Sequence, residues 1–205
     1  MSPEVKAADV KALRERTGAG MMDCKAALAD ASGDMDKAIE LLRVKGQASA
    51  AKRSGRATGE GVVASYIHAT GKVGVLVEVA CETDFVARND EFREFAREVA
   101  LHIAGAAPRP QYVSKDEIPD EARDTERRVL EQRAREDGKP DDIVEKIVAG
   151  QLAKWESEIA LLEQEHINSD RYDGKTIEDL RTDIASKTGE NVTITRFARF
   201  QVGEE

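Results

Sequence analysis

Two cysteines and three histidines are the side chains of this chain best suited to nucleophilic catalysis or metal binding. A thiol beside an imidazole could act as a nucleophile with its general base. Cys81, however, continues a strand face of alternating valines, where a cysteine behaves as a small hydrophobic residue, and we expect Cys24 to be buried filler as well. His68, His102 and His166 show no metal-ligand spacing. We therefore expect no catalytic residue and no bound metal.

Glycines near Lys72 do not form a phosphate-binding loop. The glycine-rich P-loop needs a strand before it and a helix after it. Gly71 and Gly74 are instead expected to have strands on both sides. The sequence therefore predicts no nucleotide site and no cofactor.

The segment Thr83-Asp84-Phe85-Val86 places a large aromatic residue on a turn between a strand and a helix. Burial in the protein's own core is geometrically difficult at such a position. One interpretation is that Phe85 projects as an anchor for another molecule. The alternative is that Phe85 folds back beneath the following helix as a hydrophobic staple. Local features leave both open.

Two consecutive methionines, Met21 and Met22, begin a short helix. They point in different directions, so at most one of them can face a small core. Exposed methionine suits adaptable contacts with a partner. In the alternative, both side chains fill gaps in the core, and the sequence favours neither interpretation.

The composition excludes several classes of ligand. The 31 Lys and Arg against 40 Asp and Glu give a net charge of -9, which repels phosphate backbones and anionic membranes. No apolar run approaches the roughly 20 residues that span a bilayer, and residues 1–12 mix charges where a signal peptide would be apolar. We therefore expect a cytoplasmic protein with reduced cysteines that binds neither nucleic acid nor membrane directly.

Apolar residues at helical spacing predict a small module of three helices at 1–46. The breaks between these helices fall at 17–20 and 32–34. Asp34 is expected to cap the third helix and Gly46 to end it.

Small and basic residues then replace the large apolar ones at 47–60, which indicates a linker. Residues 48–51 have good helix propensity. A helical extension of the third helix and a coil are therefore both compatible with this segment.

The remaining residues, 61–205, predict an α+β core domain with a helical excursion at about 113–165. Alternating valines predict an antiparallel hairpin, and the later segments alternate between helical and period-two patterns. The expected strands lie at 62–68, 73–81 and 192–202, and the expected helices at 89–104, 120–137, 140–162 and 177–188. The predicted fold class is thus a helix-rich core around a short antiparallel sheet, preceded by a helical module and a linker.

Two long motifs resemble those of a known family. Residues 13–25 (LRERTGAGMMDCK) resemble the N-terminal signature of bacterial elongation factor Ts, and residues 81–88 (CETDFVAR) resemble its second signature. The similarity continues through 188–191 (TGEN) to 196–200 (RFARF), so it covers essentially the whole chain, as in a short-form member. The resemblance implies a guanine-nucleotide exchange factor for elongation factor Tu, without bond chemistry of its own.

The family resemblance also implies roles for individual residues. The first three helices resemble a ubiquitin-associated-like module that docks on the nucleotide domain of the partner. Arg14, Met21 and Met22 stand at the matching contact positions. The oligomeric state stays open, although pairing of two copies through their sheets is compatible with an edge strand at 192–202.

The second signature is implied to be an exchange wedge. Asp84 and Phe85 match the residues that intrude beside the Mg²⁺ and phosphate site of elongation factor Tu·GDP, and Thr83 and Val86 complete the motif. A ubiquitin-like or other binding adaptor without exchange activity is the alternative function. It accounts for the first 46 residues but leaves Asp84 and Phe85 without a purpose.

Overall fold

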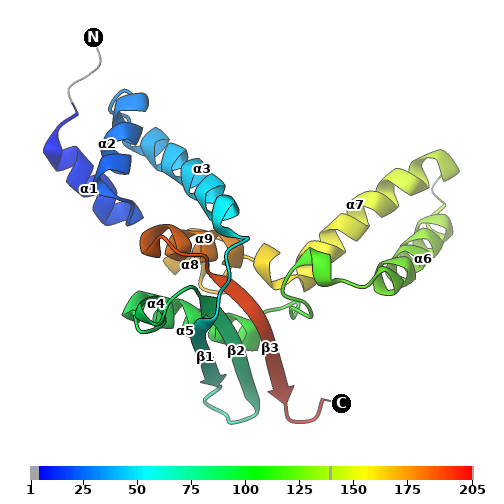
Figure 1. Ribbon diagram of the computed structural model, residues 1–205. Coiled ribbons are helices and arrows are strands. Elements are labelled where there is room, and N and C mark those ends of the chain that lie inside the picture. The colour runs from blue at the N-terminus through cyan, green and yellow to red at the C-terminus, as the bar shows by residue number, and fades with distance from the viewer. Residues whose placement is uncertain (1–4, 139, 205) are drawn as a thin grey trace. The chain divides into compact units, whose positions relative to one another are not determined.

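The structure, a computed structural model, describes residues 5–138 and 140–204 and has the expected α+β fold class (Figure 1). A three-stranded antiparallel sheet has the order β1-β2-β3. Its strands are β1 (Glu60–Ile67), β2 (Val73–Cys81) and β3 (Thr193–Gln201). The three predicted strands are confirmed within two residues at each end.

Helices make up most of the remaining structure. The α-helices are α1 (Ala7–Thr17), α2 (Met21–Asp30), α3 (Met35–Arg53), α4 (Asp84–Ala87), α5 (Asp90–Gly105), α6 (Asp120–Glu136), α7 (Asp141–Ile159), α8 (Ser169–Tyr172) and α9 (Ile177–Thr188). Two short 3₁₀ helices are η1 (Lys115–Glu117) and η2 (Leu161–Glu163). Among the described residues, none of these helices is both long and apolar enough to cross a membrane.

The chain divides into two compact units. The first unit comprises the described residues of Met1–Val63 together with Glu78–Ala96 and Asp179–Ile194. The second unit comprises the described residues of Ala64–Val77, Arg97–Glu178 and Thr195–Glu205. The first unit thus joins the N-terminal helices to parts of the predicted core domain, and the domain boundaries at 46 and 61 stay a prediction.

The first unit contains a three-helix module built as the sequence predicts. Its buried core consists of residues at helical spacing on α1, α2 and α3: Val10, Leu13, Cys24, Ala27, Leu28, Ala31, Ala38 and Leu42. Asp34 caps α3, because its side chain accepts a hydrogen bond from the backbone N–H of Lys37 at 3.0 Å.

The prediction that Gly46 ends the third helix is wrong. Helix α3 continues through Gly46 to Arg53, so the first half of the predicted linker is helical. A Cβ atom at Gly46 would lie 3.1 Å from the Ser186 hydroxyl of α9. The glycine therefore allows α9 to approach α3 closely, and it does not serve as a cap.

The predicted apolar faces of the core elements are buried. Val75, Val77, Val79 and Cys81 of β2 form the valine face that the sequence indicated. Helix α5 buries the stripe Phe92, Phe95, Ala96, Val99 and Ile103.

In the second unit, α6 and α7 form a helical hairpin (Figure 1). Its core consists of Leu130, Ala134, Val144, Val148 and Leu152, with Trp155 packed against it. Helix α7 passes through Gly150, as predicted, but it ends at Ile159 and does not reach residue 162.

Backbone pairing explains this early end of α7. The N–H groups of Gln111 and Tyr112 donate to the carbonyl of Ile159, and Leu161 N–H donates to the carbonyl of Tyr112. Residues 160–162 are therefore held by an extended segment from the loop at 105–119. The spacing of apolar residues alone cannot show that this pairing replaces the last helical turn, because the pairing partner is distant in sequence.

Candidate functional site

The Phe85 turn, residues 83–87, connects β2 to α5. Thr83 caps the four-residue helix α4, because its hydroxyl oxygen accepts a hydrogen bond from Val86 N–H at 3.5 Å. The sequence predicted a turn here, and the structure closes that turn into one turn of helix. Phe85 is 82% exposed, so the interpretation as a projecting side chain is confirmed and the hydrophobic staple is wrong.

Asp84 lies next to Phe85 on the same short helix. Its carboxylate forms an ion pair with the Arg88 guanidinium at 3.0 Å. Both side chains are well exposed, so this pair contributes little to stability. The turn therefore presents an aromatic ring next to a carboxylate that is paired with Arg88.

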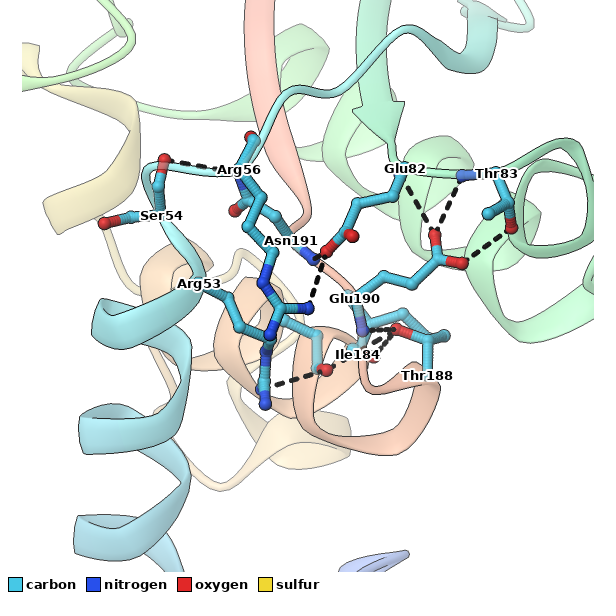
Figure 2. Close-up of polar contacts among 10 residues, drawn as sticks. Arg53, Ser54, Arg56, Glu82, Thr83, Ile184, Thr188, Glu190 and Asn191 are labelled. Carbon is cyan, nitrogen blue, oxygen red and sulfur yellow. Dashed lines mark hydrogen bonds and ion pairs between the residues drawn. The ribbon is translucent and has the colours of Figure 1, made fainter.

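A polar network holds the base of the Phe85 turn (Figure 2). One carboxylate oxygen of Glu190 accepts hydrogen bonds from the N–H groups of Glu82 at 3.0 Å and Thr83 at 3.1 Å. The other oxygen accepts from the Thr83 hydroxyl at 2.6 Å. In return, Asn191 N–H donates to the Glu82 carboxylate at 2.6 Å. We call these four residues, Glu82, Thr83, Glu190 and Asn191, the Glu190 bracket.

The Glu190 bracket also reaches the end of α3 (Figure 2). The Asn191 side-chain amide donates to the backbone carbonyls of Ser54 at 3.3 Å and Arg56 at 2.9 Å. The Arg56 guanidinium lies 3.3 Å from the Glu82 carboxylate. The hydrogen bond from Asn191 N–H lowers the pKa of the Glu82 carboxyl, and Arg56 acts in the same direction.

Helix α9, which precedes the Glu190 bracket, also contacts α3 directly. Arg43 donates to both carboxylate oxygens of Asp179 at 2.9 and 3.1 Å. Arg53 donates to the carbonyl of Ala185 at 3.2 Å. Gly189 ends α9 as predicted, with a φ of +75° that favours glycine. Helix α9 and the turn after it thus link α3 of the helical module to the Phe85 turn within the first unit.

The predicted partner-binding residues lie on the surface of the helical module. Arg14 is exposed on α1. Met21 and Met22 are 48% and 75% exposed at the start of α2, so neither is buried as the gap-filling alternative requires. These residues and the Phe85 turn lie on different elements of the first unit.

Two further exposed apolar residues of the helical module were missed by sequence reasoning. Leu41 and Val44 are exposed on α3, outside its buried stripe. An ion pair of 2.6 Å between Lys45 and Asp23 brings this part of α3 next to the first turn of α2. We call Met21, Met22, Leu41 and Val44 the methionine surface. The helical spacing of the buried residues of α3 places Leu41 and Val44 on another face, so the sequence pattern could have shown that these two side chains are exposed.

Cys81 has the properties of a structural residue. It is fully buried, and its thiol donates to the carbonyl of Thr83 at 3.2 Å. Burial raises the pKa of the Cys81 thiol to about 11, and the negative charge of Glu190 acts in the same direction. A protonated, buried thiol is a poor nucleophile.

His102 and His166 form a buried pair in the second unit, with ring centroids 5.5 Å apart. Nδ1 of His102 accepts from Ile167 N–H at 3.2 Å, so its Nε2–H donates to Gln164 Oε1 at 2.9 Å. Nδ1 of His166 accepts from Asn168 N–H at 3.1 Å. Both rings are therefore neutral and hydrogen-bonded.

Burial lowers the pKa of His102 to about 4 and also lowers the pKa of His166. The sequence indicated structural or surface histidines, and it gave no sign that these two are neighbours. Within the described part of the chain, no group of three or more His, Cys, Asp or Glu residues could hold a metal ion.

Comparisons with known proteins agree over nearly the full length of the chain. A family model described as elongation factor TS matches residues 4–204. A protein of Carboxydothermus hydrogenoformans named elongation factor Ts is 54% identical over 195 residues, which cover 95% of this chain and 88% of that protein. Proteins of the same name from Caldanaerobacter subterraneus subsp. tengcongensis and Geobacter sulfurreducens are 52% and 50% identical, each over 98% of this chain and over 98% and 90% of their own lengths.

Proposed function

The chain belongs to the elongation factor Ts family, and we propose that it acts as a guanine-nucleotide exchange factor for elongation factor Tu during translation elongation. It binds elongation factor Tu·GDP in the cytoplasm and promotes release of GDP without breaking a bond itself. The observation that carries this proposal is Phe85, a side chain 82% exposed on a turn that hydrogen bonds hold at its base.

The proposed mechanism is mechanical. Mg²⁺ demands near-ideal octahedral geometry, so a small displacement of its surroundings weakens its binding. Thr83, Asp84, Phe85 and Val86 form a wedge, with Phe85 as its tip and Asp84 adding a negative charge beside it. Inserted next to the Mg²⁺ and phosphate site of the partner, this wedge loosens the bound nucleotide.

Phe85 cannot supply the whole effect. Burying one phenylalanine contributes roughly 1.5 to 3 kcal/mol, about one to two powers of ten in an equilibrium constant. A tightly held nucleotide needs several kcal/mol more, so we propose that Arg14, Met21 and Met22 bind the partner in addition. Thermodynamic linkage then requires that GDP weakens binding of this chain as much as this chain weakens binding of GDP.

The direct test is the release of a fluorescent GDP analogue from purified elongation factor Tu, with and without this chain. We expect release to become faster as the concentration of the chain rises. Unchanged release despite complex formation would instead favour the adaptor function, in which the chain binds without exchange activity. The net charge of -9 predicts that RNA added in place of the partner is not bound.

We also propose that two copies of the chain pair through their sheets. In the second unit, Ile67, Leu76, Phe200 and Val202 are exposed apolar residues on and next to the strands, and they line a shallow hollow. Phe200, on the edge strand β3, is 71% exposed. Burying such a patch against its own copy removes it from water. Sedimentation equilibrium should give a dimer mass, and Phe200→Asp should reduce it to the monomer mass.

A further inference from the structure

The Phe85 turn is held by a residue that follows it in sequence by more than one hundred positions. Glu190 accepts three hydrogen bonds, from Glu82 N–H, Thr83 N–H and the Thr83 hydroxyl, at 3.0, 3.1 and 2.6 Å. Hydrogen bonds to an ionised acceptor are about twice as strong as neutral ones. One carboxylate therefore fixes both the backbone and the side chain of the residue that begins the Phe85 turn.

The internal contacts of the Phe85 turn are few. Backbone hydrogen bonds from Ala87 N–H to the Thr83 carbonyl at 3.2 Å and from Arg88 N–H to the Asp84 carbonyl at 3.1 Å close its single turn. The capping bond from Val86 N–H to the Thr83 hydroxyl is 3.5 Å long, at the limit for a hydrogen bond. The ion pair between Asp84 and Arg88 is exposed. A helix of four residues, such as α4, is not stable by itself in water. The orientation of Phe85 therefore depends on contacts from outside the turn.

We propose that Glu190 is a positioning residue for nucleotide exchange and that Asn191 supports it. Glu190 holds Thr83, and through Thr83 it fixes the direction in which Phe85 projects before the partner is bound. Asn191 N–H donates to the carboxylate of Glu82, the residue before the turn, and its side-chain amide donates to the carbonyl groups of Ser54 and Arg56. This inference rests on the proposed exchange function.

The physical benefit is preorganisation. A side chain that must find its binding orientation after contact loses conformational freedom at that step, and this loss lowers the gain from its burial. With Glu190 in place, most of that ordering is completed in the free protein. Removal of Glu190 should therefore slow the step that Phe85 performs and leave the contacts of the helical module unchanged.

The main experiment measures stimulated GDP release from elongation factor Tu as a function of the concentration of this chain. Glu190→Ala should lower the maximal release rate by about tenfold, the scale expected for lost hydrogen bonds to a charged group, with a nearly unchanged half-saturating concentration. Glu190→Gln keeps one oxygen for the two N–H groups, so it should restore the rate to within about threefold of wild type. Glu145→Ala, which removes an exposed glutamate from α7, is the matched control.

A double-mutant cycle separates positioning from a general effect on the fold. If Glu190 acts through Phe85, then Glu190→Ala should cause no further loss in a chain that already carries Phe85→Ala. Equal losses in both backgrounds would overturn the proposal. A maximal rate of Glu190→Ala equal to wild type would also overturn it.

A second readout needs no partner. Hydrogen exchange of the Glu82 and Thr83 amides in the free chain should become at least tenfold faster in Glu190→Ala, while amides in the core of α5 keep their wild-type rates. Unchanged hydrogen-exchange rates of the Glu82 and Thr83 amides would show that Glu190 does not hold these two N–H groups. A wild-type chain that shows this protection but fails to accelerate GDP release would overturn the exchange function, and with it the role of Glu190.

Discussion

The methionine surface and the Phe85 turn both expose large apolar side chains in the first unit, but they are supported in different ways. Met21 and Met22 lie on α2, whose other face packs into the core of the helical module. Phe85 lies on a four-residue helix, and Glu190 and Asn191 form hydrogen bonds with Thr83 and Glu82 at its base. Methionine has a flexible side chain that adapts to its partner, whereas phenylalanine has few rotamers.

These two kinds of support match the proposed division of work between docking and displacement. A docking surface only has to adhere, so flexible side chains on a stable helix are sufficient. A wedge has to displace groups of the partner, so the orientation of its side chain must be fixed by strong contacts within the protein. Separate substitutions at the two sites should therefore change the affinity for elongation factor Tu and the rate of GDP release independently.

The largest effect is expected from the methionine surface. The double variant Met21→Ala with Met22→Ala removes two exposed apolar side chains, which should weaken binding to nucleotide-free elongation factor Tu by about a hundredfold. Titration calorimetry measures the dissociation constant, and Val129→Ala, an exposed apolar residue of α6, is the control. An unchanged dissociation constant would remove these methionines from the interface.

Phe85→Ala should act on the rate more than on the affinity. We expect the maximal rate of stimulated GDP release to fall by about thirtyfold, because the free energy of burying the ring is lost at the wedge. Stopped-flow fluorescence measures this rate, and Phe85→Leu should give an intermediate value. Release at the wild-type rate would show that Phe85 is not the wedge. The fold should be unaffected, since the side chain is 82% exposed.

The second unit contains all three histidines of the chain, and two of them form the buried pair. This pair should make the stability of the chain depend on pH. The pKa of His102 is lowered to about 4 in the folded state, against about 6.5 when unfolded. The folded state therefore binds fewer protons, and stability that is present above pH 6.5 is lost as the pH falls toward 4. We expect the free energy of unfolding to fall by about 2 kcal/mol between pH 7 and pH 5.

Urea unfolding measures this change, and His102→Gln should flatten the pH dependence because glutamine does not titrate. A wild-type free energy of unfolding that is equal at pH 7 and pH 5 would contradict the neutral, buried state of the pair. His166, whose pKa is also lowered, should add to the loss in the same direction.

The smallest effect is expected at Cys81. Cys81→Ser keeps a donor toward the carbonyl of Thr83 and removes only a buried sulfur, so exchange activity should change by less than about twofold. A cysteine-dependent enzyme would instead lose its activity. Alkylation by iodoacetamide at pH 8 should be slow in the folded chain, because the thiol is buried with a pKa of about 11.

Much of the fold could be predicted because it depends on local pattern. The valine face of β2 and the stripe of α5 follow from the alternation and the helical spacing of apolar residues. The exposure of Phe85 also had a local signal, since a large aromatic residue on a turn is difficult to bury. The assignment of that residue as a wedge depended on the family resemblance.

Long-range contacts had no such signal. Glu190 lies 107 residues from Thr83 in sequence, and only the string at 188–191 drew attention to it. His102 and His166 become neighbours only in the folded chain, because no repeat in the sequence links their positions. Gly46 resembled a helix end because glycine is common there, whereas its actual role depends on the approach of α9.

The two hydrogen bonds from the Asn191 side chain to Ser54 and Arg56 change the length of free chain between the helical module and the sheet. Helix α3 runs to Arg53 and β1 begins at Glu60, so only residues 57–59 lie between the last pinned carbonyl and the first strand. Most of the expected linker at 47–60 is therefore held by helix α3 or by hydrogen bonds. A tether this short gives the second contact with a bound partner a high effective concentration, so the proposed docking by the helices and the proposed insertion of Phe85 should behave as nearly one event.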